Sequence, residues 1–128
     1  PETKFGPNTR FDFLITKNNF KAFVEVKNVT LSRTKGIAEF PDAVTTRGLK
    51  HIEELIKANE KGYKIYILYL IQRNDCKFFK IAKDIDPKYS DSLSKAVKKK
   101  LNILCFDCKF STKRIILNKK VKFKILWL

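Results

Sequence analysis

The longest apolar stretch of the sequence, residues 65–71, most narrowly limits what the chain can fold into. It is far shorter than the roughly 20 apolar residues that cross a membrane as a helix, so we expect no membrane partner. A continuous run rich in isoleucine and tyrosine is typical of a central strand covered on both faces, as in a parallel sheet. Residues 47–57 precede it with apolar side chains at helical spacing, and Gly62 suits the end of that helix.

The remaining segments complete a mixed α/β pattern. Residues 9–16 and 20–31 are rich in β-formers and flank a polar turn, which predicts an antiparallel hairpin. A second helix is expected from residue 87 to residue 100, with Pro87 in its first turn. Shorter strands are expected at residues 2–5, 78–82, 103–110 and 114–127, and a loop at 32–42. We therefore expect a single α/β domain over residues 1–128, with a mixed sheet and at least two helices.

The chain carries a formal charge of +15 and has a pI near 9.9, which favours a polyanionic partner. DNA or another nucleic acid is the first such partner, and an anionic membrane surface is the second. A genome whose composition favours lysine is the alternative explanation, because most of the basic residues are scattered lysines. The chain starts at Pro1 and contains no methionine, so we expect a processed or excised fragment of a longer protein.

The cysteines are few and odd in number, which argues against a disulfide framework and predicts a reducing, cytoplasmic location. Cys105 and Cys108 form a C-x-x-C pair. The surrounding segment is an expected strand, in which positions i and i+3 lie on opposite faces. Since the chain has one histidine and no second C-x-x-C, we do not expect a zinc site.

Asp12, Glu25 and Lys27 are the candidate catalytic residues. Side chains two apart in a strand share a face, so Glu25 and Lys27 are expected side by side. A hairpin register can bring Asp12 next to Glu25, although the sequence does not fix it. Carboxylate oxygens bind hard divalent cations, so Asp12 and Glu25 predict a Mg²⁺ or Mn²⁺ site. A lysine beside them can orient water, act as a base or stabilise charge on an attacked phosphate.

This D…(D/E)-x-K pattern is weak by itself, because such strings arise easily in a lysine-rich chain. Pro-Asp42 followed by Asp75-Cys-Lys77 reproduces the motif literally, but Asp42 lies in an expected loop and Asp75 in an expected turn. Asp12 and Glu25 lie in expected strands, where carboxylates are unusual. The alternative for them is a solvated sheet face with cross-strand ion pairs.

Basic residues also gather at the start of the first helix, where Arg47, Lys50 and His51 share one side. Positive side chains at a helix N-terminus oppose the helix dipole, and contact with phosphate would offset that cost. Arg73 follows the apolar strand and can reach the same edge of the sheet. Gly48 is mildly unfavourable in a helix, which close approach of a backbone or ligand would explain. The alternative is a solvated helix face with a structural His51.

Several segments resemble, in order, the sugar fermentation stimulation protein A family. The most specific is Phe-Pro-Asp-Ala-Val-Thr-Thr-Arg-Gly-Leu-Lys-His at residues 40–51; the others are Arg-Phe-Asp-Phe at 10–13, Phe-Val-Glu-Val-Lys-Asn-Val-Thr-Leu at 23–31, Ile-Gln-Arg at 71–73 and Asp-Ile-Asp-Pro at 84–87. The resemblance implies a restriction-endonuclease-like PD-(D/E)xK fold, with a mixed central sheet flanked by helices. It also implies that an N-terminal OB-like domain of the family is absent from this chain.

The resemblance further implies DNA binding linked to sugar-utilisation genes. It carries a nuclease-like site onto Asp12, Glu25 and Lys27, and it matches Glu2 to an upstream glutamate of the family. DNA-contacting residues are expected around this site, and they are Arg10, Arg47, Lys50, His51 and Arg73.

Three functional hypotheses remain open. The first is a DNA-binding module with an active metal-dependent nuclease centre, and the second is a regulatory DNA binder whose carboxylates are vestigial. The third is a basic domain that associates with a membrane surface or the ribosome. That hypothesis predicts basic residues clustered away from Asp12 and Glu25, for example on the helix at residues 87–100. The sequence does not give the oligomeric state, and a homodimer stays open.

Overall fold

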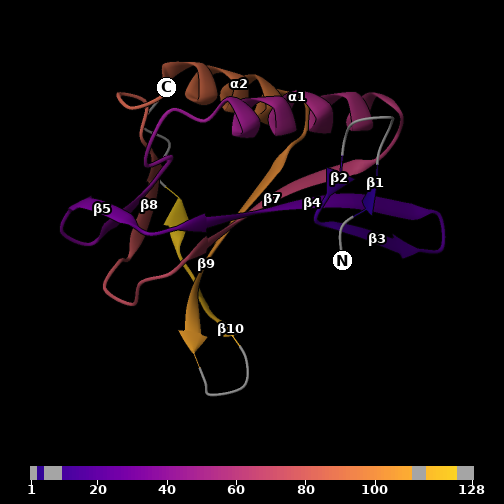
Figure 1. The fold of residues 1–128 in the computed structure, drawn as a ribbon. Helices are drawn as coiled ribbons and strands as arrows, with labels where there is room; N and C mark the ends of the chain where they lie inside the picture. Colours follow the sequence, from indigo (N-terminus) through magenta and orange to yellow (C-terminus); the bar gives the residue numbers. More distant parts are fainter. Residues whose placement is uncertain (1–2, 5–9, 111–114, 124–128) are drawn as a thin grey trace.

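The protein is described by a computed structural model that covers residues 3–4, 10–110 and 115–123 (Figure 1). Its largest sheet has five strands in the order β10-β9-β7-β4-β3. The bounds of these strands are β3 (Phe13–Lys17), β4 (Phe20–Val29), β7 (Lys64–Ile71), β9 (Asn102–Phe110) and β10 (Ile115–Lys120). A separate pair joins β1 (Thr3–Lys4) to β2 (Arg10–Phe11).

The centre of the large sheet is parallel and its edges are antiparallel. Strand β7 pairs in parallel with β4 on one side and β9 on the other, whereas β3 and β10 pair antiparallel with their neighbours. The predicted hairpin and the predicted central strand are therefore both confirmed. Together with two helices, this arrangement confirms a mixed α/β fold.

Helices α1 (Thr46–Glu60) and α2 (Pro87–Lys98) lie next to each other over the same face of the sheet (Figure 1). Apolar residues of both helices pack with Ile65, Ile67 and Tyr69 of β7 in one core. Alternate residues of β7 are buried, and those between them, such as Leu68, are only half-buried. The sequence predicted a strand covered on both faces, whereas in the structure both helices cover one face and the other face is only partly covered.

Both helices begin where their sequences predict. Thr45 caps α1 by accepting a hydrogen bond from the backbone N–H of Gly48, and Gly62 follows the helix with a φ of 96°. Asp86 caps α2, with Pro87 in its first turn. No helix among the described residues is long and apolar enough to cross a membrane.

A smaller sheet of four strands stands beside the large one, in the order β11-β8-β6-β5. Its strands are β5 (Leu31–Thr34), β6 (Ile37–Phe40), β8 (Phe78–Ile81) and β11 (Lys122–Phe123). The loop predicted at residues 32–42 is therefore largely a hairpin. The polar residues of this segment suggested a loop. In the structure, Arg33 instead forms ion pairs with the buried Glu39 and with Asp84.

Candidate functional site

Asp12 lies at a bend between β2 and β3, next to the middle of β4. The hairpin register pairs Phe13 with Val24, so Asp12 follows on beside Glu25. Its Oδ2 atom accepts a hydrogen bond of 2.7 Å from the backbone N–H of Val26. The expectation that Asp12 lies inside a continuous strand was wrong. At this point the side chain of Asp12, and not a strand backbone, accepts the hydrogen bond from β4.

Glu25 and Lys27 share one face of β4, as the strand pattern predicts. Glu25 is 3% exposed, and its Oε1 atom lies 3.3 Å from Nζ of Lys27. The face that carries them is the one beneath the helices, since Phe23 two residues earlier also belongs to the buried core. A charged pair is therefore built into the covered face of the sheet rather than into a solvated one.

His51 completes this cluster from the second turn of α1. Its Nδ1 atom lies 2.9 Å from Oε1 of Glu25 and 2.9 Å from Nζ of Lys27. A single ring nitrogen either donates to the carboxylate or accepts from the ammonium, so the tautomer decides which contact is a hydrogen bond. His51 thus contacts the carboxylate and the lysine directly, a role that sequence reasoning did not assign to it.

The surroundings shift the pKa of both charged groups. Burial acts to raise the pKa of Glu25, but the hydrogen bond with His51 and the charge of Lys27 outweigh it and hold the pKa below its ordinary value. Burial lowers the pKa of Lys27, and the nearby charge of Arg47 lowers it further, against the opposing effects of Glu25 and Asp12. A lysine with a lowered pKa is better suited to accept a proton than an exposed lysine.

The second carboxylate oxygen of Glu25 bears on whether a divalent cation could bind at this cluster. The Oε2 atom of Glu25 is buried and has no hydrogen-bond partner among the described residues. A buried carboxylate oxygen without a partner is costly, and a cation would satisfy it. Within the same residues, no three His, Cys, Asp or Glu side chains are grouped closely enough to hold a metal together. A cation such as Mg²⁺ needs only one or two carboxylates and completes its shell with water, so Asp12 and Glu25 are the residues that would hold it.

The remaining predicted DNA contacts divide into two groups. Arg47 and Lys50 are exposed in the first turns of α1, and Arg47 is close enough to act on the pKa of Lys27. Arg73 instead binds Asp75 through two hydrogen bonds of 2.9 and 2.7 Å, and donates to the carbonyl of Thr30. None of the contacts found in the described part of the chain joins Arg73 to the cluster. Glu2 and the side chain of Arg10 lie outside that part.

The literal Pro-Asp and D-x-K string does not form a site. Asp42 is exposed in the turn before α1. Asp75 pairs with Arg73 in the turn after β7, where that guanidinium lowers the pKa of Asp75 to about 2. Both carboxylates lie in connecting segments, as the sequence predicted. Cys105 and Cys108 are both buried.

Asp86, Tyr89 and Gly48 hold the start of α1 over the cluster, and sequence reasoning missed this role. Asp86 accepts hydrogen bonds from the backbone N–H groups of Thr45 and Tyr89, so one carboxylate joins the first turns of both helices. A Cβ atom on Gly48 would lie 3.1 Å from the ring of Tyr89. The position of Asp86 before Pro87 signals the cap of α2, but no sequence signal identifies its bond to Thr45.

Comparisons with known proteins agree with this architecture. A family profile described as "Sugar fermentation stimulation protein RE domain" matches residues 1–114. A sugar fermentation stimulation protein homolog from Pelagibacter ubique (strain HTCC1062) is 54% identical over 121 residues, and the match covers 94% of this chain and 52% of that protein. A homolog from Agrobacterium fabrum (strain C58 / ATCC 33970) is 44% identical, with 94% of this chain and 51% of that protein covered.

A solved structure is also similar. SfsA from Pyrococcus furiosus, in complex with Ca²⁺, superposes with a TM-score of 0.83 and 29% sequence identity. The match covers 97% of this chain and 55% of that one. The chain thus spans about half the length of the curated relatives it matches. The resemblance read from the sequence is confirmed: the chain belongs to the sugar fermentation stimulation protein (SfsA) family.

Proposed function

We propose that this chain is a DNA-binding domain with a nuclease-like, divalent-metal centre of the PD-(D/E)xK type. The observation that carries the proposal is the buried Oε2 atom of Glu25, which has no hydrogen-bond partner in the described part of the chain. The other oxygen of this carboxylate, Oε1, lies beside Lys27, and the strand register brings Asp12 next to Glu25. The similar P. furiosus structure holds Ca²⁺, an ion that also takes oxygen ligands, and this supports a divalent cation in the family.

Asp12 and Glu25 would hold the ion, which we propose to be Mg²⁺ or Mn²⁺. Such an ion neutralises charge on a phosphodiester and makes nearby water more acidic. In the hydrolysis that we propose, a water oxygen attacks phosphorus, the bond from phosphorus to the leaving oxygen breaks, and solvent water protonates the leaving oxygen. Lys27 in its neutral amine form would accept the proton of the attacking water, and burial, which lowers its pKa, favours that form. His51 holds Glu25 and Lys27 in position through its Nδ1 atom.

DNA would approach across the exposed start of α1. Arg47 and Lys50 offer charged side chains there, and the whole chain has a net charge of +15. Contacts of this kind reach phosphates and carry little sequence information, so binding should weaken as salt rises. Arg73 is a weaker candidate contact than the sequence suggested, because its guanidinium is already paired with Asp75.

A second candidate function is DNA binding without cleavage, for example in the control of sugar-utilisation genes, and one observation favours it. Oε1 of Glu25 is already bound by Lys27 and His51, and Oδ2 of Asp12 by the backbone of Val26. These partners satisfy part of each carboxylate without any ion. The same cluster would then be a structural remnant of a nuclease site.

Cleavage of supercoiled plasmid in the presence of Mn²⁺ separates the two functions. We expect the wild type to nick the plasmid and Lys27→Ala to be slower by about 100-fold, the usual size of a lost proton-transfer group. Lys21→Ala is the matched control, because Lys21 is an exposed lysine on the same strand. Cleavage by Lys27→Ala at the wild-type rate would contradict the proposed role. Retained DNA binding with no cleavage by the wild type would favour the second function.

A further inference from the structure

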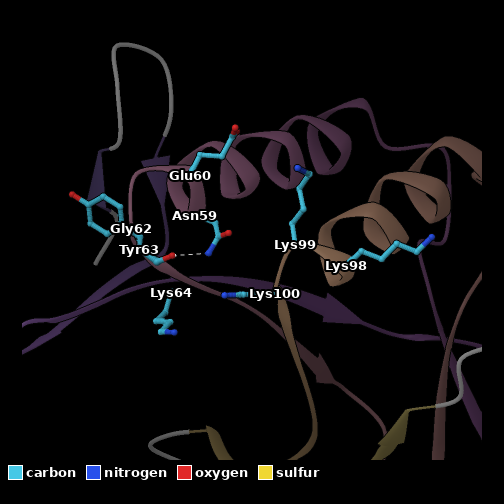
Figure 2. A pocket seen from close by; sticks show the side chains of 8 residues that line it. All are labelled: Asn59, Glu60, Gly62, Tyr63, Lys64, Lys98, Lys99 and Lys100. Atoms are coloured by element: carbon cyan, nitrogen blue, oxygen red, sulfur yellow. Dashed lines mark hydrogen bonds between the residues drawn. The ribbon is translucent and has the colours of Figure 1, made fainter.

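A pocket with a volume of about 350 Å³ lies where both helices end and β7 begins (Figure 2). Lys64, Lys98, Lys99 and Lys100 line it, together with residues at the end of α1 that include Asn59 and Glu60. The metal-site cluster contacts the opposite end of α1, through His51. We call this cavity the lysine pocket. It is separate from the proposed nuclease centre, and its chemistry does not depend on that function.

The four lysines of the pocket line one cavity, and their ammonium groups are not neutralised by a carboxylate partner within the described residues. Lys27, Arg33 and Arg73 all form ion pairs with carboxylates. No such ion pair involves Lys64, Lys98, Lys99 or Lys100 in the part of the chain that the structure describes, although Glu60 also lines the pocket. Figure 2 shows Lys100 extending towards the side of the pocket where Lys64 lies, whereas Lys99 extends alongside α1 and Lys98 extends away from the other three. Lysines that line one cavity make the electrostatic potential there positive.

Lys100 occupies a backbone conformation that favours glycine. Its φ is 72°, and the N–H groups of Lys100 and Leu101 donate to the carbonyls of Val97 and Ala96 at the end of α2. Glycine is the usual residue at this position of a helix end, because it has no Cβ. The chain therefore keeps a side chain at a local energetic cost, and that side chain is an ammonium group directed into the lysine pocket.

The chemistry of the pocket matches phosphate better than a lipid surface or a base. The apolar side chains of α2, including Tyr89 and Leu93, are buried against the core, and Val97 is the large apolar residue of this helix that is exposed. An interfacial helix needs an exposed apolar face. The ring of Tyr63 packs on Phe23 with centroids 4.7 Å apart, which reduces its availability for base stacking. Ammonium groups on flexible stems bind phosphate as point charges.

We propose that the lysine pocket binds clustered phosphate groups, supplied either by a nucleic acid strand or by a free polyphosphate. One of the three functional hypotheses predicted basic residues clustered on the second helix, away from Asp12 and Glu25. Lys98 to Lys100 form such a cluster at the end of α2. The partner we assign to them is a phosphate chain. The site carries phosphate recognition that is independent of the divalent metal.

The test compares two triple variants that remove the same number of lysines. The pocket variant is Lys64→Gln, Lys99→Gln and Lys100→Gly. The control is Lys35→Gln, Lys77→Gln and Lys83→Gln, whose lysines are exposed around the smaller sheet. Calorimetric titration with inorganic tripolyphosphate should give about tenfold weaker binding for the pocket variant, and a change of less than about twofold for the control. A labelled DNA duplex and phosphatidylserine vesicles are the other two probes.

The outcomes distinguish the source of the phosphate. A parallel loss of duplex binding identifies a nucleic acid strand, and loss for tripolyphosphate alone identifies a free polyphosphate. Equal losses in both variants, or no loss in either, would overturn the proposal, as would a loss confined to the vesicles. Lys100→Gly alone guards against misfolding, because it should bind tripolyphosphate more weakly while its free energy of unfolding does not fall. Mn²⁺ binding by the pocket variant reports separately on the proposed nuclease centre.

Discussion

The Nδ1 atom of His51 lies 2.9 Å from the Oε1 atom of Glu25, and this contact joins the start of α1 to β4. This contact holds a carboxylate that is almost completely buried, and it lowers the pKa of that carboxylate. The histidine of the most specific sequence motif is therefore a partner of the candidate metal ligand. Its position depends on α1, whose first turn is fixed by Thr45, Asp86 and the close approach of Gly48 to Tyr89.

Replacing His51 with alanine should raise the pKa of Glu25. The hydrogen bond with His51 is the largest of the interactions that lower this pKa, and burial alone acts to raise it. The carboxyl carbon of Glu25, followed by NMR as pH is changed, measures the effect directly. Lys50→Ala, which removes the exposed neighbour of His51, should leave the titration unchanged. An unchanged or lower pKa in His51→Ala would contradict the assigned contact.

Gly48→Ala should destabilise the protein, although alanine favours helices over glycine. The new Cβ would lie 2.9 Å from Cγ2 and Oγ1 of Thr45 and 3.1 Å from Cε1 of Tyr89. We expect a loss of about 1–2 kcal/mol in the free energy of unfolding, after the gain in helix propensity is included. Urea unfolding measures it, with Lys50→Ala as an exposed control on the same helix. A variant as stable as the wild type would show that Tyr89 moves aside freely.

The hydroxyl groups of Tyr69 and Tyr89 should be energetically coupled. They lie 2.6 Å apart in the core, and both side chains are fully buried. Either single change to phenylalanine leaves the other hydroxyl without this partner, which costs about 1–2 kcal/mol. The double variant should cost little more than one single variant. Urea unfolding of all four proteins gives the coupling, and strictly additive losses would contradict a shared hydrogen bond.

The cluster of Arg33, Glu39 and Asp84 should make stability fall in acid. Arg33 lowers the pKa of Glu39 from its ordinary 4.5, and that of Asp84 from 3.8 to about 2. A carboxylate with a lowered pKa stabilises the fold above its unfolded pKa, and this contribution is lost as pH falls towards the folded value. The advantage of the wild type over Arg33→Leu should therefore shrink between about pH 4.5 and about pH 2.

Unfolding measured for both proteins across this pH range tests the prediction. Lys83→Leu is a control, because it removes a positive charge one residue from Asp84 without removing either ion pair. A constant difference between wild type and Arg33→Leu over the whole range would contradict the linkage.

Much of the fold could be predicted because local sequence carries it. The apolar spacing in α1 and α2, their caps and the alternation of Glu25 and Lys27 along β4 depend on residues near one another in the chain. The hairpin of β5 and β6 could not be predicted in this way. Its polar residues are stabilised by Asp84, far along the sequence, which binds the guanidinium of Arg33.

The sequence named the residues of the candidate site, but it did not predict most of the contacts between them. The strand period was enough to bring Glu25 and Lys27 together. The bend at Asp12 depends on a side-chain bond to the backbone of Val26, and the contact of His51 depends on how α1 packs on the sheet. Arg73 was expected near the site, but its guanidinium pairs with Asp75, an oppositely charged side chain only two residues further along the chain.

Calorimetric titration with Mn²⁺ tests the central claim most directly. We predict that the wild type binds Mn²⁺ and that the double variant Asp12→Ala, Glu25→Ala gives no binding heat. Glu53→Ala is the control, because Glu53 is an exposed carboxylate on α1. Circular dichroism of each variant establishes that its fold is intact. Identical heats for the wild type and the double variant would contradict a metal site at Asp12 and Glu25.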